Sequence, residues 1–219
     1  ENHRFIPENI KIRELIKKGE IGKPFMCLSC FIGDEMKRMN DPHNWKGTKD
    51  KSGGGVIIDN GFHMIDTLRS FFGDIESVLA SSQRLVVQAE NKEEDTAIMS
   101  FTFKGGVLAD LGLTFAAQHN YFPAGYIGAG VRYDIYGTEG SIHLINGNPF
   151  PINVVKGRKI ERWTSDELAH RYPTNMNSHF IDCLINNKEP LVTAEDGIRV
   201  MQVIDACYES VKTGKRILI

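Results

Sequence analysis

The sequence predicts an α+β domain: a large, mostly antiparallel, open sheet with helices packed on one face and the other face available for oligomerisation. Runs of alternating apolar and polar residues recur through the middle of the chain, as in strands with one buried face. Helical patterns come before these strands and again after them. This order is not the regular helix–strand alternation of a doubly wound fold.

The first third of the chain predicts a helix, a strand, a long connection and a second helix. Residues 7–18 begin with a proline that suits a first helical turn, and Gly19 ends the pattern. Residues 23–32 are apolar enough for a buried strand. Residues 33–51 form a polar connection, and connections of this length in a compact domain are usually binding segments or disordered. An apolar helix is expected at 53–72.

The rest of the chain predicts a series of strands followed by two helices and a short strand. A Lys-Gly-Gly run at 104–106 marks a hairpin between two alternating stretches. Thr193 is expected to cap the last helix, with Asp196 at its third position. The expected strands are 75–87, 96–103, 107–115, 131–137, 141–145, 152–155, 159–163 and 216–219, and the expected helices are 175–187 and 194–213.

Alternation along these strands predicts that the sheet has one apolar and one mixed face. Positions 107, 109, 111, 113 and 115 are all apolar, whereas Asp110 and Thr114 lie between them. Arg132, Asp134 and Tyr136 give a neighbouring strand a similar mixed side. An open mixed face on a large sheet indicates either an oligomer interface or plain solvent exposure.

Composition and charge are those of an ordinary globular protein. The 219 residues carry a formal net charge of −2, so no nucleic-acid partner is expected. No apolar run reaches the ~18 residues that a membrane span needs, so no membrane association is expected. Cys27 and Cys30 form a C-x-x-C, but their odd spacing along a strand would point them to opposite faces. Buried free thiols in a reducing, cytoplasmic compartment are the expected interpretation.

The stretch from 52 to 66 carries the densest chemistry in the sequence. Asp59, His63 and Asp66 fall within an arc of roughly 60° on a helix that is otherwise mostly apolar. Buried ionisable groups must be paired or used, so this narrow stripe indicates either an acid/base site or a satisfied polar pair. Three glycines at 53–55 lie where the backbone must turn or pass close to another group.

A metal site is a further interpretation of the same stripe, because Asp and His four residues apart can share a cation. No second histidine or cysteine cluster lies at ligand spacing in the sequence. The sequence therefore predicts no metal here.

Several short motifs, taken in order, resemble the C-terminal domain of the Gfo/Idh/MocA family, named after glucose–fructose oxidoreductase and inositol dehydrogenase. The most specific is Asp59-x-Gly61-x-His63-x-x-Asp66 after the glycine run. The supporting pieces are Arg4-Phe-x-Pro7, Gly19-Glu-Ile-Gly-Lys-Pro24, Trp45, Asp95-Thr-Ala97, Tyr136-Gly-Thr-Glu-Gly-Ser141, Pro190-x-x-Thr193-Ala-Glu-Asp-Gly197 and Tyr208-Glu-Ser210.

The resemblance implies a two-domain enzyme in which an N-terminal Rossmann domain holds NAD or NADP. Residues 1–219 would then be the C-terminal domain, which supplies substrate contacts and the oligomer sheet. The chain begins at Glu1 without a methionine and contains neither G-x-G-x-x-G nor the Glu-Lys-Pro of the family's catalytic lysine. We therefore expect part of an enzyme, inactive alone, whose cofactor site lies mainly in a domain absent from this chain.

Carried over by position, the resemblance makes His63 the general acid/base and Asp59 a carboxylate that contacts substrate and orients His63. Trp45 and Lys46 match positions that line the sugar pocket in some members, although Lys46 stands where an arginine is sometimes found. Asp66 is expected to be structural.

Four further residues are weaker candidates. His119, Asn120 and Tyr126 lie in a stretch that could reach substrate, although a plain surface loop is the favoured interpretation. His179 opens a helix and is as readily a structural residue.

The function implied is an NAD(P)-dependent oxidoreductase acting on a sugar, cyclitol or related polyol, assembled as a homodimer or homotetramer. One alternative is an NAD-dependent glycosidase of the same family, which cleaves by transient oxidation. Another is a non-catalytic oligomerisation or sugar-sensing module.

Overall fold

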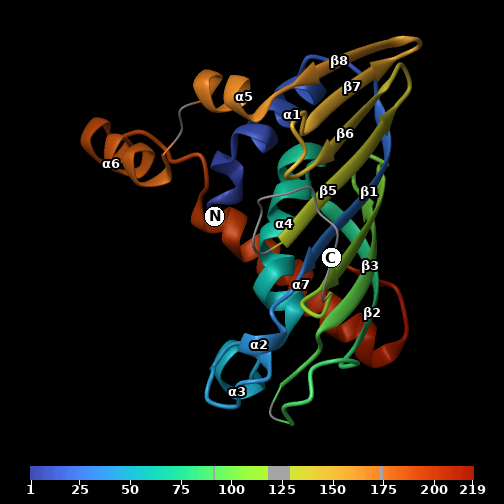
Figure 1. The fold of residues 1–219 in the computed structure, drawn as a ribbon, viewed down its shortest axis with the longest axis vertical. Helices are drawn as coiled ribbons and strands as arrows, with labels where there is room; N and C mark the ends of the chain where they lie inside the picture. Colours follow the sequence, from blue (N-terminus) through green and yellow to red (C-terminus); the bar gives the residue numbers. More distant parts are fainter. Residues whose placement is uncertain (91, 118–128, 173–174) are drawn as a thin grey trace.

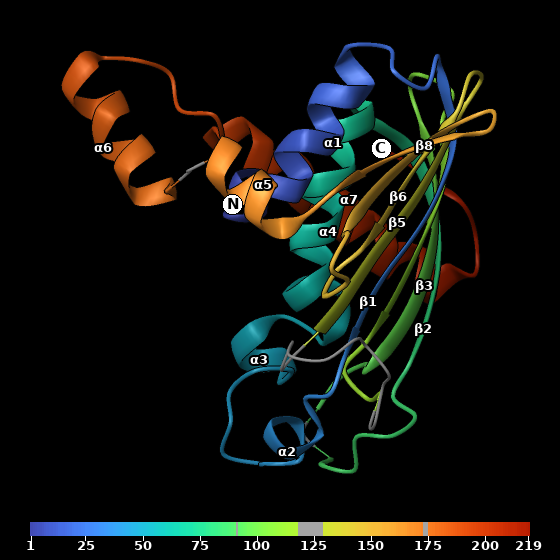
Figure 2. The ribbon, with the colours of Figure 1, turned by 45° about the horizontal axis from the view of Figure 1, so that its top comes forward.

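The structure is a computed structural model that describes residues 1–90, 92–117, 129–172 and 175–219. It has two layers, a single twisted sheet and a set of helices on one side of that sheet (Figures 1 and 2). The predicted α+β class, with a large open sheet covered on one face, is confirmed.

In the described residues the sheet has nine strands in the order β8-β7-β6-β5-β1-β4-β3-β2-β9. Seven of the eight neighbouring pairs are antiparallel, and β1 lies parallel to β4 at the centre. The strands are β1 (Pro24–Gly33), β2 (Ile75–Gln83), β3 (Thr96–Phe103), β4 (Leu108–Thr114), β5 (Ala129–Gly137), β6 (Ser141–Ile145), β7 (Ile152–Lys156), β8 (Lys159–Trp163) and β9 (Ile217–Leu218).

Two long helices, α4 and α7, lie against the sheet and against each other, and their apolar sides form the core with the inward-facing strand residues. In both views α6 stands away from the rest of the molecule. The helices are η1 (His3–Phe5), α1 (Pro7–Lys17), α2 (Met36–Met39), α3 (Lys49–Ser52), α4 (Val56–Phe72), α5 (Ser165–Arg171), α6 (Met176–Asn186) and α7 (Ala194–Thr213).

The structure corrects three of the sequence-based elements. The connection 33–51 contains the short helices α2 and α3, and α4 begins at Val56 rather than at 53. The strand expected at 75–87 ends at Gln83, because the backbone N–H groups of residues 85–87 donate to Asp95 instead of to a neighbouring strand. Helix α5 was not predicted, although Thr164 and Glu167 form a capping box at its start.

The faces of the central strands agree with the alternation in the sequence. Every odd-numbered residue from 107 to 115 is buried against the helices. Cys27 is buried and Cys30 is partly exposed, and all four cysteines in the described residues are free. In the part of the chain that the structure describes, no helix combines the length and apolar character needed to cross a membrane.

Candidate functional site

The start of α4 is set by glycines that let two other segments approach closely. Gly53 adopts a φ of +84°, a left-handed conformation that favours glycine. A Cβ on Gly55 would lie 1.9 Å from the carbonyl oxygen of Glu94, and one on Gly54 would lie 1.9 Å from the Tyr208 hydroxyl. The expectation that the glycine run marks a close backbone approach is confirmed.

Glu94 satisfies the first turn of α4. Its Oε1 accepts hydrogen bonds from the backbone N–H of Gly55 at 3.0 Å and of Ile57 at 3.1 Å, and from the Tyr208 hydroxyl at 2.9 Å. The Glu94 carbonyl accepts from the N–H of Val56 at 2.9 Å. A helix start leaves its first N–H groups without intrahelical partners, and here one residue takes three of them. The helix that bears Asp59 and His63 is therefore fixed in place at its first turn.

Asp59 is paired with Lys46, which comes from the segment between α2 and α3. The Lys46 Nζ lies 2.9 Å and 3.2 Å from the two carboxylate oxygens of Asp59. Buried Lys92 holds this segment in turn by donating to the carbonyl oxygens of Asn44 and Lys46. The neighbouring Trp45 side chain is 55% exposed. The structure thus brings two predicted site residues into contact at the first turns of α4, with an exposed indole beside them in sequence.

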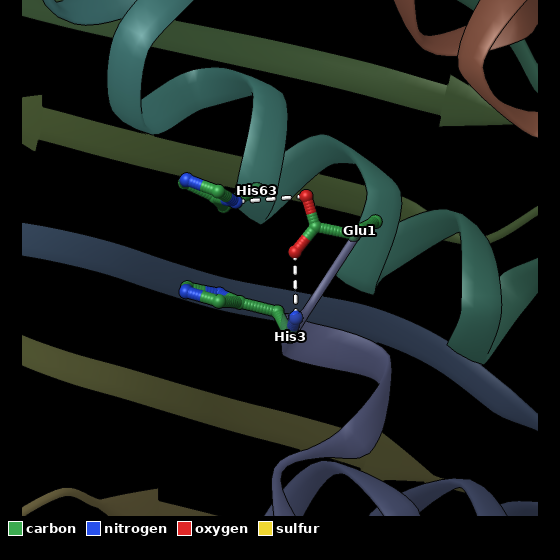
Figure 3. A group of neighbouring side chains, drawn as sticks. All are labelled: Glu1, His3 and His63. Carbon is green, nitrogen blue, oxygen red and sulfur yellow. Dashed lines mark hydrogen bonds and ion pairs between the residues drawn. The ribbon is translucent and has the colours of Figure 1, made fainter. Parts of the chain in front are cut away.

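His63 bonds not to Asp59 but to Glu1, at the beginning of the chain. Figure 3 shows the Glu1 carboxylate between two groups. Its Oε2 lies 2.7 Å from His63 Nδ1, and its Oε1 accepts the backbone N–H of His3 at 2.6 Å. The Glu1 side chain is 2% exposed, whereas the His63 side chain remains 34% exposed. The imidazole is therefore anchored on one edge and accessible elsewhere.

The ring of His3 stacks on the ring of His63. Their centroids are 4.5 Å apart and their planes differ by 17°. Burial, together with the neighbouring His63, lowers the pKa of His3 to about 4, so this ring is neutral at pH 7. A cavity of about 240 Å³ opens beside His3 and is lined in part by Asn9, Tyr133 and Asn146. His3 thus borders a hollow whose walls carry both polar and apolar side chains.

The sequence did not predict that Glu1, His3 and His63 lie together, because Glu1 and His63 are 62 residues apart. In the described part of the chain, one ligand atom from each of these three lies within 4.8 Å of the others. Two imidazoles and a carboxylate are ligands that zinc accepts. However, the nearly parallel rings do not aim their nitrogens at a common point, and both Glu1 oxygens already accept hydrogen bonds. The absence of a metal stays a prediction.

The remaining candidates are placed as follows. Asp66 is buried and accepts two hydrogen bonds from the Arg4 guanidinium, as expected for a structural carboxylate. His179 accepts the backbone N–H of Leu191 at 3.0 Å, which holds α6 to the segment after it. His119, Asn120 and Tyr126 lie outside the described residues.

Comparison with known proteins supports an oxidoreductase relationship. The profile of the C-terminal alpha/beta domain of an oxidoreductase family, Gfo/Idh/MocA, matches residues 13–219. The chain is 23% identical to a D-apiose dehydrogenase of Paraburkholderia graminis, over 99% of the chain and 57% of that protein. It is 24% identical to a scyllo-inositol 2-dehydrogenase (NAD(+)) of Bacillus subtilis, over 96% of the chain and 59% of that protein.

The fold is also shared with solved structures. A levoglucosan dehydrogenase in complex with NADH and levoglucosan superposes with a TM-score of 0.83 at 17% identity, over 100% of the chain and 64% of that structure. At this identity the likeness shows the fold alone. Across these three proteins the chain spans between 57% and 64% of the relative's length.

Proposed function

The chain belongs to the C-terminal alpha/beta domains of the Gfo/Idh/MocA oxidoreductase family, and from this premise we propose that it binds the substrate of an NAD(P)-dependent dehydrogenase or reductase. The substrate class is a sugar, a cyclitol or a related polyol. The names of the relatives support this class, since they refer to D-apiose, scyllo-inositol and levoglucosan. The single observation that carries the proposal is the placement of His63, an accessible imidazole anchored on a helix whose start is fixed.

In this proposal His63 transfers the proton. During oxidation of a secondary alcohol, its Nε2 takes the proton of the hydroxyl group while the C–O bond becomes a carbonyl. In the reverse direction the imidazolium returns that proton. A nicotinamide cofactor, when bound, supplies the hydride acceptor for the same carbon. An imidazole suits this work near pH 7 because its ordinary pKa lies close to that value.

Lys46, Asp59 and Trp45 would bind the substrate. The Lys46–Asp59 pair offers an ammonium and a carboxylate, which together donate to and accept from neighbouring hydroxyl groups. The exposed Trp45 ring offers an apolar surface for the C–H face of a sugar ring. Asp59 also keeps Lys46 in place, because the two side chains bond each other directly.

A short run near the end of the chain resembles part of a phosphate-binding loop but does not have its structure. This run, Thr213-Gly-Lys-Arg216, ends a helix instead of beginning one. Gly214 there is the C-cap of α7, with a φ of +67°. In this proposal NAD or NADP is therefore held by a nucleotide-binding domain of a longer polypeptide, and the present residues act on the substrate.

The open face of the sheet would join copies of the chain into a homodimer or homotetramer. The strand register puts four apolar side chains on the face away from the helices. They are between 39% and 62% exposed, and they are Leu28, Leu79, Ile98 and Leu108. Large apolar side chains gathered on one face of a central sheet are typical of a surface that is covered by a partner.

The test is a polyol panel assayed with both cofactors, using an enzyme that contains this chain and its His63→Ala variant. Loss of the general acid/base should lower turnover by about 10² or more. Near-normal turnover of the variant would contradict the assignment. Release of an aglycone from a glycoside without net formation of NADH would instead favour the glycosidase alternative.

A further inference from the structure

We propose that Glu1 is the positioning residue of His63: it holds the imidazole in the tautomer that carries the proton on Nδ1, which leaves Nε2 as the proton acceptor. The tautomer is a property of the chain itself. Its catalytic meaning rests on the proposed function, in which His63 moves the substrate proton. The proposal departs from the assignment made from sequence, in which Asp59 orients His63.

The hydrogen bonds around Glu1 fix which nitrogen of His63 carries a proton in that contact. The Oε1 atom accepts a backbone N–H, that of His3, which is always a donor. The Oε2 atom lies 2.7 Å from His63 Nδ1. An ionised carboxylate can only accept, so the proton of this contact lies on Nδ1. In its neutral form the imidazole carries one N–H, so with the proton on Nδ1 the Nε2 atom is the one left to accept a proton.

Glu1 has the properties that this role requires. Burial alone would raise its pKa, but the hydrogen bonds from His63 and from the His3 backbone outweigh burial and lower the pKa below its usual value. The group is therefore ionised at neutral pH. Its side chain is 2% exposed, so water does not compete for the oxygens. The carboxylate is both charged and fixed.

The other neighbours of the ring do not replace Glu1. Asp59, one turn earlier on the same helix, is engaged by Lys46. His3 lies against the face of the ring and is neutral at pH 7. Phe62 packs edge-on at 5.8 Å between centroids. In addition, the Thr67 hydroxyl donates to the His63 carbonyl at 2.9 Å, which fixes the backbone but not the tautomer. Glu1 is the neighbour whose contact selects the protonated nitrogen.

The direct test is a measurement of the His63 tautomer by long-range ¹H–¹⁵N correlation spectra of the ¹⁵N-labelled chain at pH 7.5. We expect a protonated Nδ1 and an unprotonated Nε2. Free imidazole side chains prefer the opposite tautomer, so the result is informative. Observation of the Nε2–H tautomer in the wild-type chain would overturn the proposal, and this measurement needs neither cofactor nor substrate.

Substitutions of Glu1 sharpen the test. Glu1→Gln offers one carbonyl oxygen to two donors, the His3 N–H and the His63 Nδ1–H, so both cannot be satisfied. We expect the variant to shift His63 toward the Nε2–H form, in which Nδ1 accepts from the amide. Glu1→Asp keeps two acceptor oxygens and should keep the wild-type tautomer. Glu76→Gln, the same exchange on an exposed strand residue, should change nothing. An unchanged His63 tautomer in Glu1→Gln would overturn the proposal.

The kinetic consequence is measured in an enzyme that contains the chain, with NAD(P) and its best polyol. Glu1→Gln should lower kcat by about 10² with KM changed less than about threefold, because a wrong tautomer disables proton transfer rather than substrate binding. Glu1→Asp should recover most of the loss. If Glu1→Gln changed the tautomer of His63 but left kcat unchanged, the result would contradict the proposed role of Glu1 in catalysis. If His63→Ala itself retained turnover, the proposed function would fail while the tautomer result stood.

Discussion

The Arg4 guanidinium donates two hydrogen bonds of 2.7 Å to the Asp66 carboxylate, one from Nε and one from Nη2. The two residues are 62 positions apart, and the Asp66 side chain is 1% exposed. Arg4 lies in η1, one residue after His3, and Asp66 lies one turn after His63 on α4. This pair therefore joins η1 to α4, the two segments that carry the stacked histidines. It holds the beginning of the chain at the distance from α4 at which Glu1 bonds His63.

Asp66→Asn should lower the free energy of unfolding by about 3 kcal/mol, because it leaves the buried Arg4 charge without one of its two carboxylates. The change is measured by urea denaturation at pH 7. The matched control is Asp182→Asn, which breaks an exposed pair with Lys188 and should cost less than about 1 kcal/mol. Similar losses of unfolding free energy in the two variants would show that the Arg4–Asp66 pair stabilises the fold no more than an exposed ion pair does.

Gly55→Ala should destabilise the chain severely, because the new Cβ would lie 1.9 Å from the backbone oxygen of Glu94 and neither backbone can yield easily. Gly197→Ala is the control with the opposite sign. Gly197 lies within α7, a Cβ added there would meet no atom within 4 Å, and alanine in a helix is favoured over glycine by roughly 0.5–1 kcal/mol. Thermal unfolding followed by circular dichroism should show a lower Tm for the first variant and an equal or higher Tm for the second.

Acidification from pH 7 to pH 5 should destabilise the chain through His3. Its pKa is lowered from 6.5 in the unfolded state to about 4 in the folded state, so the unfolded chain takes up the proton first. The resulting loss begins as pH falls through 6.5 and is complete below about 4. His3→Phe keeps an aromatic ring against His63 but cannot titrate, so it should lose less stability over this interval. Equal losses, measured by urea unfolding at both pH values, would contradict the assignment.

Charges on the open face of the sheet should dissociate the proposed oligomer. In Ile98→Lys/Leu108→Lys, two ammonium groups would have to be desolvated at the proposed interface, which strongly disfavours association. Light scattering after size exclusion should show a dimer or tetramer for the wild type and a monomer for the variant. Leu85→Lys, at an exposed position outside the strands, should not change the mass. An unchanged mass of the double variant would exclude this face as the interface.

Much of the fold was predictable because its strands and long helices carry strong local signals. Alternation identified 96–103, and the hairpin expected around Gly157 gave 159–163, both with the same bounds as the structure. The capping box at Thr193 gave the start of α7. The sequence analysis missed helix α5 because its seven residues show little apolar periodicity, so the Thr164 cap was the one available signal. The end of β2 was set by the carboxylate of Asp95, ten residues after Leu85. A local sequence pattern does not reveal such a contact.

The candidate site divides in the same way. His63 and Asp59 were identifiable because they lie on one helical stripe after a glycine run. Their partners were not. Lys46 was singled out by resemblance, but its bond to Asp59 depends on how the segment before α3 folds back. Glu1 and His3 reach His63 only through the tertiary fold, so neither spacing nor periodicity could assign the carboxylate that bonds the imidazole.

The pairing of β1 with β4 has a consequence for when the sheet can form while the protein is being synthesised. β1 is the first strand of this sheet to leave the ribosome, yet it occupies the centre of the sheet, where Cys27 pairs with Ala109 on one side and Ile135 on the other. At roughly 5–20 residues per second, about a hundred residues must be synthesised before both neighbours exist, a delay on the order of 5–20 s. Until β4 emerges, this apolar strand has no neighbouring strand of its sheet to pair with. The middle of this sheet is therefore completed late, and one edge of β1 stays unpaired until β5 emerges.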